Sequence, residues 1–355
     1  MKYKDKIDSL IDKLQIDIDK NVEIKGRAPT AVSSEFITNK EQGDWAERLV
    51  YNLINRNDDE YVAVRYGVND DLSAGDQGFK EYYSKYQREL NNIGKRPDIL
   101  IFHRKDIETK TEISDCMVKR AICALEVRSS SFLLKKYNDF MKKRTEKAYQ
   151  EIEKSINTIR NDSELSLLLQ QKDEVLYGYL MTASRSTFDT LTFRVRNWSS
   201  TPKLEELSSI LKKIKNSISE IQKRDFLSIT PKVEDIALVN RWIQKYNVPH
   251  YYLQVFFDSA YIISFEDILN IASDYKRESI DFSIEKDVKN QGKTTIKINV
   301  HAADLIIDEI KIPEHYSSMK ELDRGRLLFF VKFRGDSGYI KGEIFKKLMA
   351  GATDD

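Results

Sequence analysis

Two short apolar segments, each with an acidic residue at one end, constrain the fold of this chain most strongly. In DILIF, residues 98–102, Asp98 follows a proline and opens an apolar run. In ICALEV, residues 122–127, Glu126 stands near the end of a similar run. Such runs have the length and composition of central strands. If the two strands are adjacent and antiparallel, the start of one lies beside the end of the other, so Asp98 and Glu126 converge.

A converging pair of carboxylates predicts a particular chemistry. The two negative charges repel each other, so such a pair either binds a divalent cation or raises the pKa of one member. Hard oxygen ligands favour Mg²⁺, which retains water and completes its shell with a phosphate, as phosphodiester hydrolysis requires. Taken singly, a Pro-Asp at a strand start is commonly a loop exit, and a strand-end Glu beside an Arg is commonly a surface ion pair.

The remaining pattern interleaves helices and strands, which predicts an α/β or mixed α+β fold. We expect a central mixed sheet flanked by helices, an N-terminal helical segment over residues 1–40, a core over 41–265 with insertions, and a C-terminal subdomain over 266–355. The sequence pattern predicts helices over residues 5–18, 40–55, 137–159, 203–223, 230–247 and 264–272, and a helix or an irregular insert over residues 79–90. Strand composition predicts further strands over residues 61–67, 174–183, 191–196, 250–258, 293–300 and 326–335.

Composition excludes several classes of protein. The 58 basic and 57 acidic residues give a net charge of +1, so any basic surface for a nucleic acid must be local. The N-terminus has no apolar secretory segment, and the most apolar later stretch, residues 251–265, is too short and too polar to span a membrane. The four histidines show no metal-ligand spacing, and there is no phosphate-binding glycine motif for ATP or a dinucleotide. We therefore expect a cytoplasmic protein that uses no ATP.

Pro97-Asp98 together with Glu126-Val127-Arg128 resembles the PD-(D/E)XK motif of a nuclease superfamily. The resemblance implies a core made of a helix, a three-stranded antiparallel meander, a helix and a final parallel strand. Residues 41–128 supply a helix and three strand candidates in that order. The segments GDWAE, LEVRSSSF and residues 228–269 are similar to type II restriction endonucleases of the AccI type.

The resemblance assigns roles to five residues. Asp98 and Glu126 would be ligands of Mg²⁺, Val127 would add its backbone carbonyl, and Glu47 of the first helix would be a further ligand, with Asp44 as its rival. Arg128 stands where the superfamily usually has lysine. Arginine supplies charge and hydrogen bonds but stays protonated, so it cannot act as a general base.

That departure leaves three possibilities open: a slower enzyme, a lysine recruited from elsewhere such as Lys135, or loss of catalysis. The resemblance also implies a homodimer that cuts double-stranded DNA at a palindromic site. The rival readings are a structure-selective repair or recombination nuclease and a catalytically silent DNA-binding protein. Candidate DNA contacts come from two stretches with basic residues, and they are Arg194, Arg196, Arg324, Arg326, Lys332 and Arg334.

Overall fold

The computed structural model describes residue 7 and residues 32–67, 72, 74, 76–107, 113–287, 293–322 and 325–351. The helix expected over residues 5–18, apart from Ile7, and the candidate DNA contact Arg324 lie outside these ranges. The chain divides into two compact units, one formed by the residues up to Leu134 with those from Leu227 onward, the other by Lys135–Phe226. The domain boundaries expected at residues 40 and 265 stay a prediction.

The larger unit contains a seven-stranded mixed sheet with the order β1-β2-β3-β5-β6-β9-β12. The first three strands form an antiparallel meander, and β5 joins β3 in parallel. This is the order of strands that the resemblance implies. The strands are β1 (Tyr61–Arg65), β2 (Ile99–His103), β3 (Cys123–Ser129), β5 (His250–Val255), β6 (Ser259–Ser264), β9 (Asp304–Asp308) and β12 (Tyr339–Ile340).

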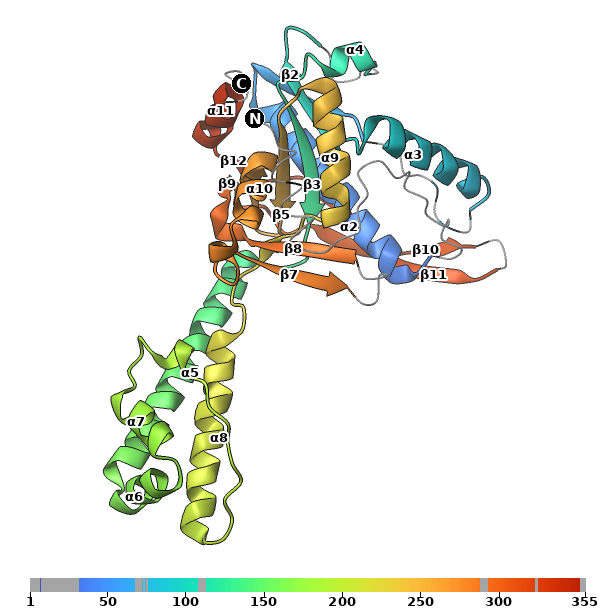
Figure 1. Cartoon of the computed structure of the whole chain (residues 1–355). Coiled ribbons are helices and arrows are strands. Elements are labelled where there is room, and N and C mark those ends of the chain that lie inside the picture. Colours follow the sequence, from blue (N-terminus) through green and yellow to red (C-terminus); the bar gives the residue numbers. More distant parts are fainter. Residues whose placement is uncertain are drawn as a thin grey trace. The chain divides into compact units, whose positions relative to one another are not determined.

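Helices cover both faces of this sheet (Figure 1). Ile99 and Ile101 of β2 pack in the cluster that contains α2 (Ser34–Asn57), whereas Leu100 and Phe102 pack in the cluster that contains α9 (Val233–Tyr246). Because successive strand residues point to opposite faces, a strand buried on both faces is apolar throughout. This accounts for the uninterrupted apolar runs in the sequence.

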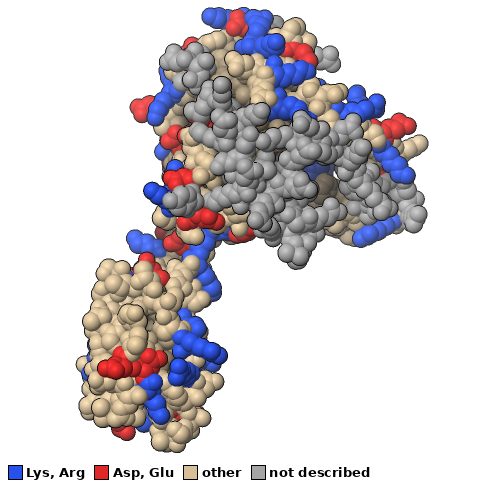
Figure 2. All heavy atoms as spheres, in the orientation of Figure 1, with Lys and Arg blue, Asp and Glu red and all other residues tan. Residues whose placement is uncertain are grey.

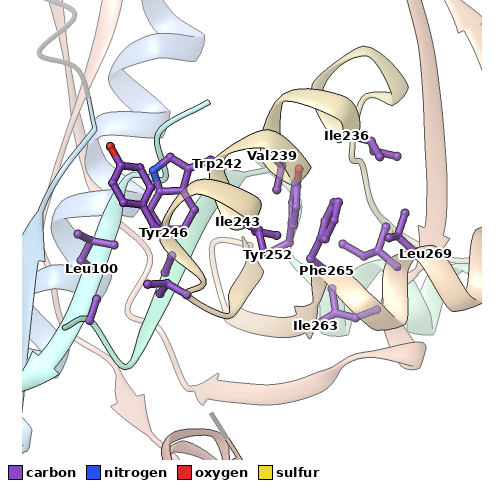
Figure 3. Packing of buried hydrophobic residues seen from close by; sticks show 14 of the residues in the cluster. Leu100, Ile236, Val239, Trp242, Ile243, Tyr246, Tyr252, Ile263, Phe265 and Leu269 are labelled. Atoms are coloured by element: carbon purple, nitrogen blue, oxygen red, sulfur yellow. The ribbon is translucent and has the colours of Figure 1, made fainter. Parts of the chain in front are cut away.

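The aromatic residues of α9 form the centre of one core. Trp242 and Tyr246 pack over Leu100, and further along the helix Val239 lies near Tyr252 of β5 (Figure 3). Helix α10 (Phe265–Ser273) extends this layer, and the Ser264 hydroxyl caps its start by accepting a hydrogen bond from the Asp267 amide. Trp45 on the α2 side is equally buried, so Trp45 and Trp242 are both core residues.

Among the described residues, the rest of the larger unit adds two small sheets and three α-helices. They are α3 (Phe79–Ile93), α4 (Asp115–Val118), the sheet β4-β8-β7 (Ser228–Ile229, Lys293–Asn299, Phe282–Asp287), the hairpin β10-β11 (Glu314–Glu321, Leu327–Arg334) and α11 (Gly342–Gly351). The mixed α+β class is therefore confirmed. Among the described helices, none combines the length and the apolar character needed to cross a membrane.

The second unit is helical, which makes two strand predictions wrong. Residues 174–183 form helix α7 (Glu174–Thr182), because Asp173 caps its start and Leu176 and Leu180, one turn apart, enter the core. Residues 191–196 form neither a helix nor a strand. The unit's other elements are α5 (Leu134–Asn161), α6 (Ser163–Lys172), the short 3₁₀ turn Phe188–Thr190 and α8 (Pro202–Gln222).

Candidate active site

The pairing of β2 with β3 brings Asp98 and Glu126 together. Ile99 lies opposite Leu125 in the antiparallel ladder, and the Asp98 amide donates a 3.0 Å hydrogen bond to the Leu125 carbonyl. The next residues outward along the two strands are Asp98 and Glu126. The Val127 amide then donates a 2.7 Å hydrogen bond to Oδ2 of Asp98, which fixes that carboxylate against β3. The expected convergence of the two acids follows from this register.

Glu126 lies on the α9 face of the sheet with its charge almost fully buried. Its neighbours Leu125 and Val127 belong to the core on the α2 side, so Glu126 and Arg128 point to the other side. The Glu126 side chain is only 2% exposed. Its Oε1 accepts a 2.7 Å contact from Arg128 and a 2.6 Å contact from Lys95. A buried carboxylate needs such partners, because burial without them costs several kcal/mol.

Asp235 of α9 completes a four-membered charge cluster that the sequence analysis missed. Its Oδ2 lies 3.0 Å from Nζ of Lys95 and 3.3 Å from Nη2 of Arg128. Two cations therefore bridge two anions, the buried Glu126 and the partly buried Asp235. A signal for Asp235 was present, since it stands one turn before Val239 on the stripe that α9 buries. For Lys95 the only signal was its place directly before Arg96, Pro97 and Asp98.

The cluster opens into a polar cavity of about 880 Å³. Glu126 and Arg128 of β3 line it, and the segment before β2 adds Lys95 and Asp98. Helix α2 contributes its polar face. The lining residues from α2 are Asn39, Lys40, Gly43, Asp44, Glu47 and Arg48. A cavity with this many charged groups suits a charged, hydrated substrate rather than an apolar ligand.

The two strand acids have opposite electrostatic environments. Burial, together with the charges of Glu126 and Glu47, raises the pKa of Asp98 well above its ordinary value. Burial acts in the same direction on Glu126, but Lys95 and Arg128 outweigh it and lower the pKa of that carboxyl. Burial opposes the charge of Lys95, yet Glu126 and Asp235 raise its pKa, so the ammonium stays protonated. Ionisation of Asp98 is thus disfavoured in this environment, and a cation bound beside it would stabilise the ionised form.

Glu47 and Asp44 both line the cavity. The charge of Glu47 contributes to the raised pKa of Asp98. Glu47 is half-buried and Asp44 is exposed. Glu47 therefore contributes to the electrostatic environment of Asp98.

The acidic side chains of the cavity are the candidate ligands for a divalent cation. No group of three or more His, Cys, Asp or Glu side chains among the described residues is arranged to hold a metal ion. Two observations nevertheless fit one: burial and two neighbouring acids raise the pKa of Asp98, so its ionised form needs a further positive charge, and Oε2 of Glu126 is buried with no hydrogen-bond partner in the described part of the chain. A buried carboxylate oxygen without a hydrogen-bond partner lowers stability unless a bound ligand interacts with it.

The candidate DNA contacts fall in both units. Arg194 and Arg196 are exposed residues of the helical unit, and Arg326 is exposed beside β11. Lys332 and Arg334 line a second depression of about 480 Å³ on the hairpin β10-β11. Lys135, the lysine considered as a replacement for the motif lysine, is the first residue of the helical unit.

Arg48 lies between the acidic cavity and the depression on the hairpin β10-β11. It lines both the acidic cavity and the hairpin depression, and its guanidinium donates a 2.9 Å hydrogen bond to the Phe333 carbonyl. Arg334 lies over the ring of Tyr316 at 4.5 Å, and Lys332 is 3.5 Å from Glu41. On the face drawn in Figure 2, Lys and Arg are interspersed with Asp and Glu over the described residues, in line with the near-zero net charge.

A family described as AccI restriction endonuclease matches residues 1–351. The chain belongs to this family. It is a type II site-specific deoxyribonuclease that binds DNA, as the sequence analysis predicts. No curated protein and no solved structure matches the chain. The family match spans almost the whole sequence, including both units, so the helical unit is part of the restriction enzyme.

Proposed function

We propose that the chain cleaves double-stranded DNA at a specific sequence with the help of Mg²⁺, and that Asp98 and Glu126 hold the cation. The observation that carries this proposal is the register of β2 and β3, which sets the two carboxylates side by side at the cavity. Carboxylate oxygens are the ligands that Mg²⁺ prefers. The orphaned Oε2 of Glu126 and the raised pKa of Asp98 support the same assignment.

Two further groups complete the proposed donor set. The Val127 amide points toward Asp98 rather than toward β5. The N–H and C=O of one strand residue point to the same side, so the Val127 carbonyl also lies toward the cavity. Glu47 reaches the same acids from α2 and is proposed as an additional ligand. Asp44 remains the alternative because it also lines the cavity.

The side chains of the site divide the chemistry among them. When bound, a divalent cation supplies the activation of water and the stabilisation of the leaving oxygen that phosphodiester hydrolysis needs. Asp98 and Glu126 supply the negative charge that binds it. Arg128 holds positive charge and N–H donors beside the place where a phosphate would lie, and it moves no proton because guanidinium stays protonated.

We further propose that two copies of the chain act on one duplex. The two strands of DNA run in opposite directions, so two sites related by a two-fold axis address both strands of a palindrome. The basic residues Arg48, Lys332 and Arg334 are proposed to contact the DNA, because they extend from the acidic cavity onto the hairpin β10-β11. Arg326 and the exposed Arg194 and Arg196 are further proposed contacts.

Digestion of a long DNA of known sequence tests the proposed function. The enzyme is incubated with Mg²⁺ or with EDTA, and the ends of the products are mapped by sequencing. Discrete fragments whose ends share one short palindromic sequence, formed only with Mg²⁺, support the proposal. Undirected degradation, or discrete fragments that persist in EDTA, would contradict it.

A further inference from the structure

We propose that Lys95 is the catalytic cation of this site, and that Asp235 of α9 is the residue that positions it. The inference deepens the proposed nuclease function and rests on it. Lys95 reaches the site from the loop before β2, whereas the motif position two residues after Glu126 holds Arg128. Both cations contact Glu126, but their chemistry differs.

The contacts of Lys95 place its ammonium at the acidic pair. Nζ lies 2.6 Å from Oε1 of Glu126 and 3.0 Å from Oδ2 of Asp235. An ammonium has three N–H donors, and these two contacts use two of them. Because Lys95 also lines the cavity, the third donor is available to a phosphate oxygen or to water beside Glu126. With 17% of its side chain exposed, Lys95 is more deeply enclosed than Arg128, at 30%.

The backbone that carries Lys95 is fixed against α9. Gly94 has φ of +83°, and a Cβ at that position would lie 2.2 Å from the Leu238 carbonyl oxygen and 2.8 Å from the Trp242 nitrogen. The Lys95 amide donates a 3.1 Å hydrogen bond to the same Leu238 carbonyl. Only glycine allows this close approach. The main chain that carries Lys95 is therefore held in a fixed position by the contact between the loop and α9. A lysine on the surface would instead sample many positions.

A second anchor holds the preceding helix end. Arg241 of α9 donates hydrogen bonds of 3.2 and 2.9 Å to the carbonyls of Leu90 and Asn91, at the C-terminal end of α3. Arg96 lies over the ring of Tyr66 at 4.9 Å. The segment on both sides of Lys95 is thus tied down, which is the preorganisation that transition-state stabilisation requires.

The same geometry implies competition between Lys95 and a divalent cation. The ammonium occupies Oε1 of Glu126, one of the two carboxylates proposed to hold the metal. The ammonium of Lys95 at that distance repels a divalent cation. Once the divalent cation binds, we expect the ammonium to turn toward the cavity while it keeps its contact with Asp235. Removing the charge of Lys95 should therefore strengthen metal binding and weaken catalysis, an opposite pair of effects that a structural lysine would not give.

The experiment compares wild type with Lys95→Met, Lys95→Arg and, as a control for charge removal, Lys119→Met, an exposed lysine at the end of α4. Single-turnover cleavage is measured in Mg²⁺, duplex binding in Ca²⁺, Mn²⁺ binding to the DNA-free protein, and thermal unfolding for the fold. For Lys95→Met we expect cleavage slower by on the order of 10²-fold or more, duplex binding within about threefold, and Mn²⁺ binding tighter by on the order of tenfold. Lys119→Met should match wild type throughout.

Lys95→Arg keeps the proposal testable if Lys95→Met fails to fold. If Lys95 only neutralises Glu126, arginine suffices and cleavage stays normal, which would overturn the proposal. If a compact ammonium is needed, cleavage falls at least about tenfold although the positive charge remains. Wild-type cleavage or weaker Mn²⁺ binding in a folded Lys95→Met would also overturn it. Failure of the wild-type enzyme to cleave would instead refute the proposed function, and the Mn²⁺ measurement would still decide the placement of Lys95.

Asp235→Asn tests the positioning role. This variant should lower the cleavage rate by on the order of tenfold in the wild-type background, since it loosens Lys95, and should have little further effect in Lys95→Met. Fully additive losses would show that Asp235 acts independently of Lys95.

Discussion

The amide of Val127 donates a 2.7 Å hydrogen bond to Oδ2 of Asp98, and this contact joins the two strands at the point where their acids meet. Beyond Leu125, β3 continues while β2 gives way to the loop, so the Asp98 side chain takes the place of a main-chain acceptor. The carboxylate is thereby held in one orientation, with its other oxygen left for a ligand.

Asp98→Asn should abolish cleavage, with a loss of at least about 10³-fold, because the amide removes the negative charge that attracts the cation while its oxygen still accepts from Val127. Binding of the cognate duplex in Ca²⁺ should persist, and thermal unfolding should change little. Single-turnover cleavage in Mg²⁺ is the measurement. Continued Mg²⁺-dependent cutting by this variant would rule Asp98 out as a ligand.

Glu47→Gln should lower the cleavage rate and raise the Mg²⁺ concentration needed for half-maximal activity. The reason is that Glu47 adds charge next to Asp98 from α2 without forming part of the strand pair. Asp44→Asn is the matched control, since it removes an acid from the same face of α2. A Mg²⁺ titration of both variants checks the assignment, and a larger shift for Asp44→Asn would exchange the two roles.

Arg128→Lys should retain measurable cleavage, whereas Arg128→Ala should lose on the order of 10²-fold, the scale of one preorganised stabiliser. Lysine preserves a charge that can reach Glu126, which Arg128 contacts at 2.7 Å. Duplex binding should change far less than the rate in both variants. Near-normal cleavage by Arg128→Ala would leave Lys95 as the sufficient cation, and equal loss of folding in both would mark Arg128 as an ion-pair partner only.

Gly94→Ala should destabilise the protein by about 2 kcal/mol or more, because its Cβ would overlap the main chain of α9 and its φ is positive. Cleavage should fall with it, since the same loop carries Lys95. Gly178→Ala is the control: Gly178 lies inside α7 with open space around it, and alanine there should stabilise by about 0.5–1 kcal/mol. Denaturant unfolding measures both, and an unaffected Gly94→Ala would show that the loop is not fixed against α9.

The strand pair and its two acids could be predicted from the sequence, because local residue patterns encode them. Asp98 and Glu126 could be placed from the apolar runs beside them and from the antiparallel register that such runs favour. Lys95 and Asp235 could not be placed with them, since Asp235 lies 107 residues from Arg128 and meets it only through the packing of α9 on the sheet. The wrong strand at residues 174–183 has a similar origin: tyrosine and valine suit strands, but the Asp173 cap and the pairing of Leu176 with Leu180 in the core decided for a helix.

Anomalous diffraction from a crystal of the enzyme with Mn²⁺ and its DNA tests the central claim most directly. The account predicts an anomalous peak within about 2–2.5 Å of carboxylate oxygens of both Asp98 and Glu126. A crystal that supports cleavage yet shows Mn²⁺ only elsewhere, with Glu126 still bound to Lys95 and Arg128, would contradict it.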